Sequence, residues 1–104
     1  MIITQQAERG GVVRLTLSGE LDLATADRLQ QHVQRALAQP ARKLVLDLAG
    51  VAFCDSTGLG ALLHARNTAV EHGTGFQVTR PRGLTQRVLE VSGLLDILTG
   101  ATDP

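Results

Sequence analysis

An almost unbroken apolar run near the middle of the chain, KLVLDL at residues 43–48, sets the first constraint on the fold. The run is too short for a buried helix, and Asp47 is its one interruption, which is typical of a central strand covered on both faces. On either side of it, residues 25–40 and residues 58–72 repeat apolar side chains at three- and four-residue steps. Each of these flanking segments is therefore predicted to be an amphipathic helix.

The segment before the first helix has the period of a strand. Residues 12–18, VVRLTLS, alternate apolar and polar side chains, as expected where only one face is covered. The preceding MIIT at residues 1–4 predicts a short edge strand, and Gly10-Gly11 predicts the turn that joins the two. The chain is thus expected to begin with a β-hairpin.

The segment after the second helix continues the alternation. Residues 75–79, GFQVT, predict a strand, and residues 81–93, opened by a proline and closed by a glycine, predict a third helix. LLDIL at residues 94–98 predicts a last short strand, and TGATDP at residues 99–104 a frayed tail. The order of elements predicts an α/β fold with a mixed, mostly parallel sheet of four to five strands and three to four helices, in one domain over residues 1–104.

Composition narrows the range of functions. Lys plus Arg and Asp plus Glu each number 10, and the resulting formal charge of zero argues against binding to nucleic acid, as does the presence of only two aromatic residues. MIITQQAERGG at residues 1–11 lacks a basic segment followed by a long apolar core, and no apolar run in the sequence approaches ~18 residues. We therefore expect a cytoplasmic protein without direct membrane insertion. The single Cys54 cannot form an internal disulfide, and we expect it to be a small buried hydrophobe.

Polar residues follow two of the predicted strands. GELD, which ends at Asp22, comes after residues 12–18, and CDSTG, which contains Asp55, Ser56 and Thr57, comes after residues 43–48. Functional groups of open α/β sheets usually lie beyond the carboxyl ends of the strands. We therefore expect both carboxylates and both hydroxyls to share one edge of the sheet.

Ser56 is a poor candidate for a nucleophile. A hydrolase of the nucleophile-elbow type needs a glycine two residues before the serine, where this chain has Cys54, and it also needs a histidine base. His32, His64 and His72 all fall inside predicted helices, away from the loops that follow the strands. The sequence thus argues against a serine hydrolase.

Other catalytic interpretations are equally weak. DSTGLG contains no Lys, which a phosphate-binding loop requires, and Asp22 and Asp55 alone are a poor magnesium site. We expect no enzymatic activity, no cofactor and no metal. A purely structural interpretation remains open, in which Asp55 or Ser56 caps the following helix and Gly58 eases its tight start.

Three longer segments, GELDLATADRL, LVLDLAGVAFCDSTGLGALL and GLTQRVLEVSGL, together resemble the STAS family, and within it the stand-alone bacterial anti-sigma factor antagonists. The resemblance is strongest over residues 10–98, and D-S-T-G-L-G is its most specific part. It implies a STAS-type single domain. It also implies a partner, an anti-sigma factor that is a serine kinase, which binds the unmodified protein, releases its sigma factor and phosphorylates the serine after the motif's aspartate, here Ser56.

The resemblance further implies that a PP2C-type phosphatase restores the active form, and that ATP and Mg²⁺ belong to the kinase. Asp22 and Asp55 would orient the acceptor hydroxyl or meet basic groups on the kinase. Thr57 is a competing hydroxyl, whose alternative role is capping. Gly58 and Gly60 let the kinase approach closely, or they merely ease the turn. An alternative function with the same fold is a subunit of a larger assembly, such as a lipid-transport complex or a stressosome-like scaffold.

Overall fold

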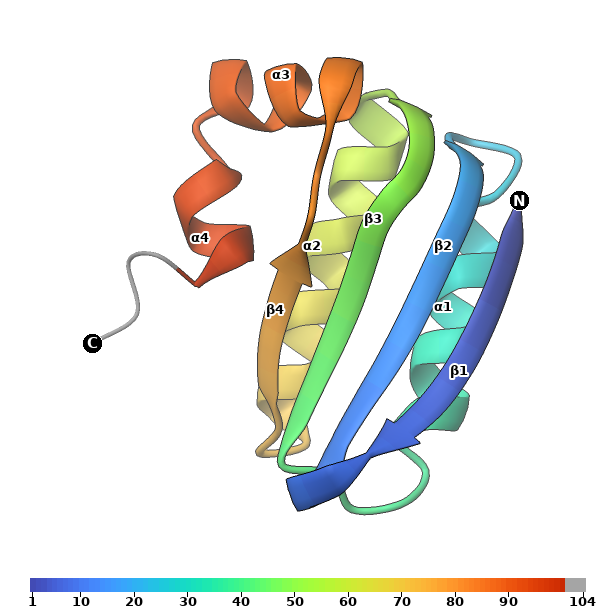
Figure 1. Cartoon of the computed structure of the whole chain (residues 1–104), viewed down its shortest axis with the longest axis vertical. Helices are drawn as coiled ribbons and strands as arrows, with labels where there is room; N and C mark the ends of the chain where they lie inside the picture. The colour runs from blue at the N-terminus through green and yellow to red at the C-terminus, as the bar shows by residue number, and fades with distance from the viewer. Residues whose placement is uncertain (101–104) are drawn as a thin grey trace.

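A computed structural model describes residues 1–100 of the protein, and strands and helices alternate along these residues (Figure 1). This part of the chain contains four strands, four α-helices and one short 3-10 helix. Their bounds are β1 (Ile2–Glu8), η1 (Arg9–Gly11), β2 (Val12–Leu21), α1 (Ala26–Ala36), β3 (Lys43–Cys54), α2 (Ser56–Glu71), β4 (Gly75–Thr79), α3 (Gly83–Ser92) and α4 (Leu95–Thr99). The predicted α/β class, with its strand and helix numbers, is confirmed for the described residues.

The four strands form one sheet in the order β1-β2-β3-β4. β1 is antiparallel to β2, whereas β2, β3 and β4 run parallel to one another. The predicted hairpin is confirmed, and Gly10 and Gly11 adopt φ values of 76° and 78° in its turn, a region that L-residues other than glycine rarely enter. The edge strand is longer than predicted, because pairing with β2 continues from Ile2 to Glu8.

Helices α1 and α2 lie side by side behind the sheet in Figure 1 and cover one of its faces. The core between these layers consists mainly of leucine, and the side chains of Leu15, Leu17, Leu44 and Leu46 are fully buried there. Each such leucine contributes about 1.5–3 kcal/mol relative to an exposed position. The apolar stripe that predicted α1 supplies its buried residues, including Leu29.

The other face of the sheet carries no helix over β1 and β2 (Figure 1). Residues 44–48 of β3 are all buried, as predicted for a strand covered on both faces. Around Asp47, however, the cover on this second face consists of the long side chains of Arg14 and Arg80. A carboxylate therefore occupies a central strand because neighbouring guanidinium groups pair with it.

The predicted last strand at residues 94–98 is wrong. Leu95–Thr99 form the short helix α4, which contacts β4 and α2, and Gly93 ends α3 with a φ of 78°. Leu94 and Leu98 are four residues apart, so one turn of helix places both on the same side, and Leu98 is fully buried. A five-residue apolar run fits both the two-residue repeat of a strand and the 3.6-residue repeat of a helix. Here the packing of its leucines favours the helix. Residues 101–104 of the predicted frayed tail lie outside the described residues.

Candidate functional site

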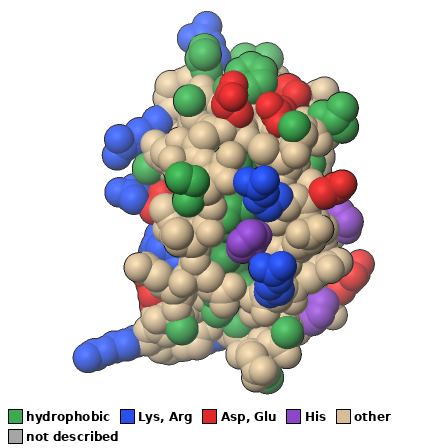
Figure 2. Space-filling view, turned by 90° about the vertical axis from the view of Figure 1, so that its right-hand side faces the viewer, with side chains coloured by type: hydrophobic (Ala, Val, Ile, Leu, Met, Phe, Trp, Pro, Cys, Tyr) green, Lys and Arg blue, Asp and Glu red, His purple; other side chains and the backbone are tan. Residues whose placement is uncertain are grey.

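The ends of β2 and β3 lie side by side, which brings the two polar segments together. Leu21 pairs with Cys54 in the parallel register, and the backbone N–H of Asp55 donates to the carbonyl oxygen of Leu21 over 3.3 Å. Asp22 and Asp55 directly follow these paired residues. Seen from the side of β1 and α1, acidic and hydrophobic side chains lie together at the upper end of the molecule, where β2 and β3 finish (Figure 2).

Asp55 is the residue that starts α2. Its backbone is extended, with φ −99° and ψ −171°, and its Oδ1 accepts a hydrogen bond of 2.9 Å from the backbone N–H of Gly58. The helix therefore begins at Ser56, two residues earlier than the apolar pattern predicts, because a cap satisfies a free N–H of its first turn. The capping role predicted as the alternative for Thr57 is wrong, since Asp55 fills it.

Ser56 is the first residue of α2, and its side chain is exposed. Within residues 1–100 its hydroxyl has no hydrogen-bond partner, and neither has the exposed hydroxyl of Thr57. No histidine in this part of the chain is hydrogen-bonded to Ser56, and His64 lies two turns further along the same helix. The Ser56 hydroxyl is thus presented to solvent without a base beside it.

Asp22 shapes the loop between β2 and α1. Its Oδ1 accepts from the backbone N–H of Ala24, and its own N–H donates to Oγ1 of Thr25, both over 3.0 Å. The Thr25 hydroxyl in turn donates to the carbonyl oxygen of Glu20 over 2.8 Å. No side chain caps α1 in the structure. The carbonyl oxygen of Asp22 instead accepts the backbone N–H groups of Thr25 and Ala26.

The two glycines of the motif have different surroundings. A Cβ added to Gly58 would stand 2.3 Å from the carbonyl oxygen of Leu21 and 2.8 Å from Sγ of Cys54, so the start of α2 packs directly on the end of β2. A Cβ added to Gly60 would meet nothing within 4 Å. Close packing accounts for Gly58, and only Gly60 leaves open space on the surface of the helix.

Cys54 is buried with 2% of its surface exposed, as predicted. Burial raises the pKa of its thiol to about 11, and the negative charge of Asp55 acts in the same direction. The thiol is therefore protonated at neutral pH, which makes it a poor nucleophile.

Two grooves flank the start of α2. The groove on the side of α1 has a volume of about 260 Å³, and that on the side of α3 has a volume of about 450 Å³. The first is lined by Ala26, Asp27, Gln30, Thr57, Gly60, Ala61 and His64. The second is lined by Phe53, Cys54, Asp55, Ser56, Leu59, Arg87, Val88, Val91 and Ser92. Sequence reasoning missed the second groove, because Val88 and Val91 repeat at a spacing typical of the buried side of a helix. The buried residues of α3 are instead Thr85 and Leu89.

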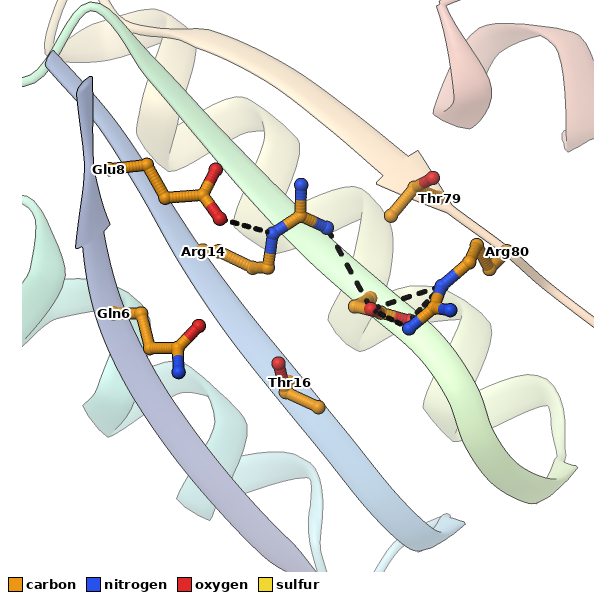
Figure 3. A pocket seen from close by; sticks show the side chains of 7 residues that line it. Gln6, Glu8, Arg14, Thr16, Thr79 and Arg80 are labelled. Atoms are coloured by element: carbon orange, nitrogen blue, oxygen red, sulfur yellow. Dashed lines mark hydrogen bonds and ion pairs between the residues drawn. The ribbon is translucent and has the colours of Figure 1, made fainter. Parts of the chain in front are cut away.

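A polar cavity of about 500 Å³ lies on the open face of the sheet (Figure 3), and Ser56 is not among the residues that line it. Arg80 donates from Nε to both carboxylate oxygens of Asp47 over 3.2 and 3.3 Å, and Arg14 bridges Asp47 and Glu8. Burial alone would raise the pKa of Asp47, but the hydrogen bonds from Arg80 and Ala49 and the charges of the two arginines outweigh it and lower that pKa. The carboxylates and guanidinium groups in this cavity pair with one another. Their presence is therefore explained by the stability of the fold, without a bound ligand.

Within residues 1–100, no three His, Cys, Asp or Glu side chains gather closely enough to hold a metal ion. None of the helices in the described part of the chain combines the length and the apolar character needed to cross a bilayer.

Comparison with known proteins gives consistent matches over most of the chain. A family model described as "Mlab, STAS domain" matches residues 4–99. The anti-sigma-F factor antagonist RsfB of Mycobacterium tuberculosis is 33% identical over 88 residues, which cover 85% of this chain and 71% of that protein. An anti-sigma F factor antagonist of Paenibacillus polymyxa is 33% identical over 89 residues, with 85% and 76% coverage.

A solved structure extends the likeness to three dimensions. The crystal structure of an anti-sigma factor antagonist from Mycobacterium paratuberculosis matches with a TM-score of 0.76 and 33% identity, over 94% of this chain and 83% of that one. The family model and the solved structure both match most of this chain, over residues 4–99 and over 94% of its length respectively. This chain therefore belongs to the STAS domain family.

Proposed function

We propose that this chain is an anti-sigma factor antagonist. Its unphosphorylated form binds an anti-sigma factor that is also a serine kinase, and the sigma factor is thereby released. Phosphorylation of Ser56 by that kinase ends the binding, and a PP2C-type phosphatase restores it. The chain acts as a binding protein and a kinase substrate, not as an enzyme, and it works in the cytoplasm, where sigma factors act.

One observation carries this proposal: the Ser56 hydroxyl is exposed and free of partners within residues 1–100, at the start of a helix that Asp55 already caps. A nucleophile would need a base, and a capping hydroxyl would accept a backbone N–H. A kinase substrate needs only that the hydroxyl be accessible. The 33% identity to two anti-sigma-F factor antagonists supports this choice.

The neighbouring residues fit supporting roles. Asp22 and Asp55 hold the two loops in shape and leave carboxylate oxygens at the same edge, where basic groups of a kinase can meet them. Thr57 is the second accessible hydroxyl, and Gly60 leaves room for a partner beside it. Gly58 contributes indirectly, because it lets α2 start against β2.

A phosphate on Ser56 has a larger effect on binding than on folding. It adds about 1.5–2 negative charges. The helix N-terminus stabilises a nearby anion by about 0.3–1 kcal/mol, and the adjacent Asp55 opposes that gain. In a docked interface the same charge must lose its water without a designated partner, which typically costs ~2–5 kcal/mol, or about 30-fold to several thousand-fold in affinity. The proposed switch is therefore electrostatic.

The test is a binding experiment with anti-sigma factor kinases from the same genome. The wild-type chain and Ser56→Ala should bind, whereas Ser56→Asp should bind at least about 30-fold more weakly. With ATP and Mg²⁺, mass spectrometry should find one phosphate on the wild-type chain and on Thr57→Ala, and none on Ser56→Ala. Equal binding of Ser56→Asp and Ser56→Ala, together with no phosphate on Ser56, would disprove the proposal.

A second candidate function keeps the fold but makes the chain a subunit of a larger assembly, such as a lipid-transport complex or a stressosome-like scaffold. The family model that matches this chain is described as "Mlab, STAS domain" and mentions no antagonist, so family membership alone does not decide between the two. Co-purification from the source cells separates them, because a subunit would be recovered with fixed partners whether or not Ser56 is phosphorylated.

A further inference from the structure

The groove between α2 and α3 is an apolar hollow next to Ser56. It holds about 450 Å³, and its exposed surface is almost entirely apolar, although Ser56 forms part of its wall. Figure 1 shows α3 crossing the end of the sheet at which α2 begins. The hydroxyl of the proposed phosphorylation site and the apolar wall of α3 therefore border the same space.

The apolar side chains of this groove exceed what the core requires. Leu89 and Thr85 face inward from α3 and are fully buried, and the Thr85 hydroxyl donates to the carbonyl oxygen of Val51 over 3.0 Å. Val91 on the same helix is 80% exposed, and Phe53 at the end of β3 is 41% exposed. Single exposed hydrophobic residues are ordinary, but a cluster lining one hollow indicates a surface that another molecule covers.

Two charged side chains line this groove, one of each sign. Asp55 lines the groove, but its carboxylate accepts a backbone hydrogen bond at the helix N-terminus. Arg87 lines it as well and forms no ion pair with any residue between 1 and 100. An apolar hollow with one unpaired guanidinium group is complementary to an apolar side chain that has an acidic neighbour.

We propose that this groove receives an apolar side chain of the same anti-sigma factor, flanked by an acidic residue that pairs with Arg87. The inference rests on the proposed function, because a partner that contacts Ser56 covers the groove of which Ser56 is a wall. It also gives the switch a location. A phosphate on Ser56 places its charge at the edge of an apolar contact, where no water can solvate it once the partner is bound.

The structure offers a matched pair of valines to test this. Val91 in the groove and Val70 outside it are each the last but one residue of a helix, α3 and α2 respectively, and Val70 is also exposed, at 57%. Val91→Asp and Val70→Asp therefore carry the same penalty from the helix dipole. Circular dichroism and urea unfolding of both variants check that they fold equally well, and Val91→Ser provides an uncharged version.

Affinity for the anti-sigma factor kinase is then measured with unphosphorylated chains. We expect Val91→Asp to bind about 30-fold more weakly than wild type, Val91→Ser to bind several-fold more weakly, and Val70→Asp to match wild type within about twofold. Arg87→Gln should lose about two- to fivefold and should make binding less sensitive to salt.

The outcomes separate this inference from the function on which it rests. If wild type binds no anti-sigma factor, the proposed function and the occupant of the groove are both wrong. If wild type binds and Val91→Asp binds equally well, the groove assignment alone is wrong, whereas unchanged binding of Arg87→Gln disproves the acidic neighbour. If Val91→Asp instead dissociates a homodimer of the wild-type chain, the occupant is a second copy and the inference is overturned.

Discussion

The backbone of Gly58 lies so close to Leu21 that a Cβ on the glycine would stand 2.3 Å from the Leu21 carbonyl oxygen. That oxygen also accepts the backbone N–H of Asp55, so one carbonyl group at the end of β2 holds both the last turn before α2 and the first turn of α2. The position of Ser56 relative to Asp22 depends on this contact, because Asp22 directly follows Leu21 and Ser56 lies two residues before Gly58.

Gly58→Ala is therefore expected to destabilise the protein. The methyl group has to push α2 away from β2, and overpacking of this kind typically costs about 1–3 kcal/mol. Urea unfolding at pH 7 measures the change. Gly60→Ala is the matched control, since its methyl group enters open space and alanine is the better helix former, which predicts a gain of about 0.5–1 kcal/mol. Equal effects of the two variants would contradict the close packing at Gly58.

Ser56→Asp is expected to leave the fold intact. The new carboxylate lies in the first turn of α2, where the helix dipole favours it by about 0.3–1 kcal/mol, and the neighbouring Asp55 offsets part of that. We predict an unchanged far-ultraviolet circular dichroism spectrum and a free energy of unfolding within about 1 kcal/mol of wild type. Ser56→Ala is the uncharged control. Loss of helical signal only in the aspartate variant would mean that the switch acts by unfolding.

The lowered pKa of Asp47 predicts how the free energy of unfolding depends on pH. Its pKa is lowered from the ordinary 3.8 in the folded protein, because the hydrogen bonds and charges of its arginine partners outweigh burial. Its ionised form thus stabilises the fold fully above the unfolded-state pKa, and this contribution is lost as the pH falls through the lower, folded-state pKa.

Comparison of wild type with Asp47→Asn isolates that contribution. Urea unfolding should show the variant less stable at pH 7, with a gap that stays constant down to about pH 4 and narrows at lower pH. Glu8→Gln is a suitable control, because the Glu8 side chain is 38% exposed, whereas that of Asp47 is 3% exposed. A gap independent of pH would show that packing, and not charge, makes Asp47 important.

Cys54 should resist labelling in the folded protein. With burial and the Asp55 charge raising its pKa to about 11, few thiolates exist at pH 8, whereas an unfolded cysteine has a pKa near 8.5. Reaction with a thiol reagent at pH 8 should be at least roughly 100-fold slower in buffer than in concentrated urea. Comparable rates in the two conditions would indicate that the segment before Ser56 opens readily.

Periodicity was sufficient to predict most of the fold. The three longest helices and the order of the strands follow from where Leu, Val and Ala recur, because these elements each run long enough to show a period. The run at residues 94–98 was too short to show one, and it formed a helix where a strand was predicted. The sequence also could not predict which face of the sheet Asp47 lies on, because its partner Arg80 is 33 residues away along the chain.

The candidate site was predicted in its position but not in its details. The sequence places Asp22, Asp55 and Ser56 at one edge, and the pairing of Leu21 with Cys54 confirms it. Which side chain caps α2 depends on a single hydrogen bond, and three neighbouring residues were chemically able to form it. The groove beside Arg87 depends on how α3 packs against β3, which no local pattern records.

The cap formed by Asp55 has a kinetic consequence. Since Asp55 already caps α2 in the unmodified chain, we expect the two forms of the proposed switch to share one backbone and to interconvert without rearrangement of the chain. Under the proposed function, the speed of the response is then set by how often a kinase or a phosphatase encounters the molecule. A cell can therefore tune this pathway through the concentrations of those enzymes, with no delay contributed by the protein itself.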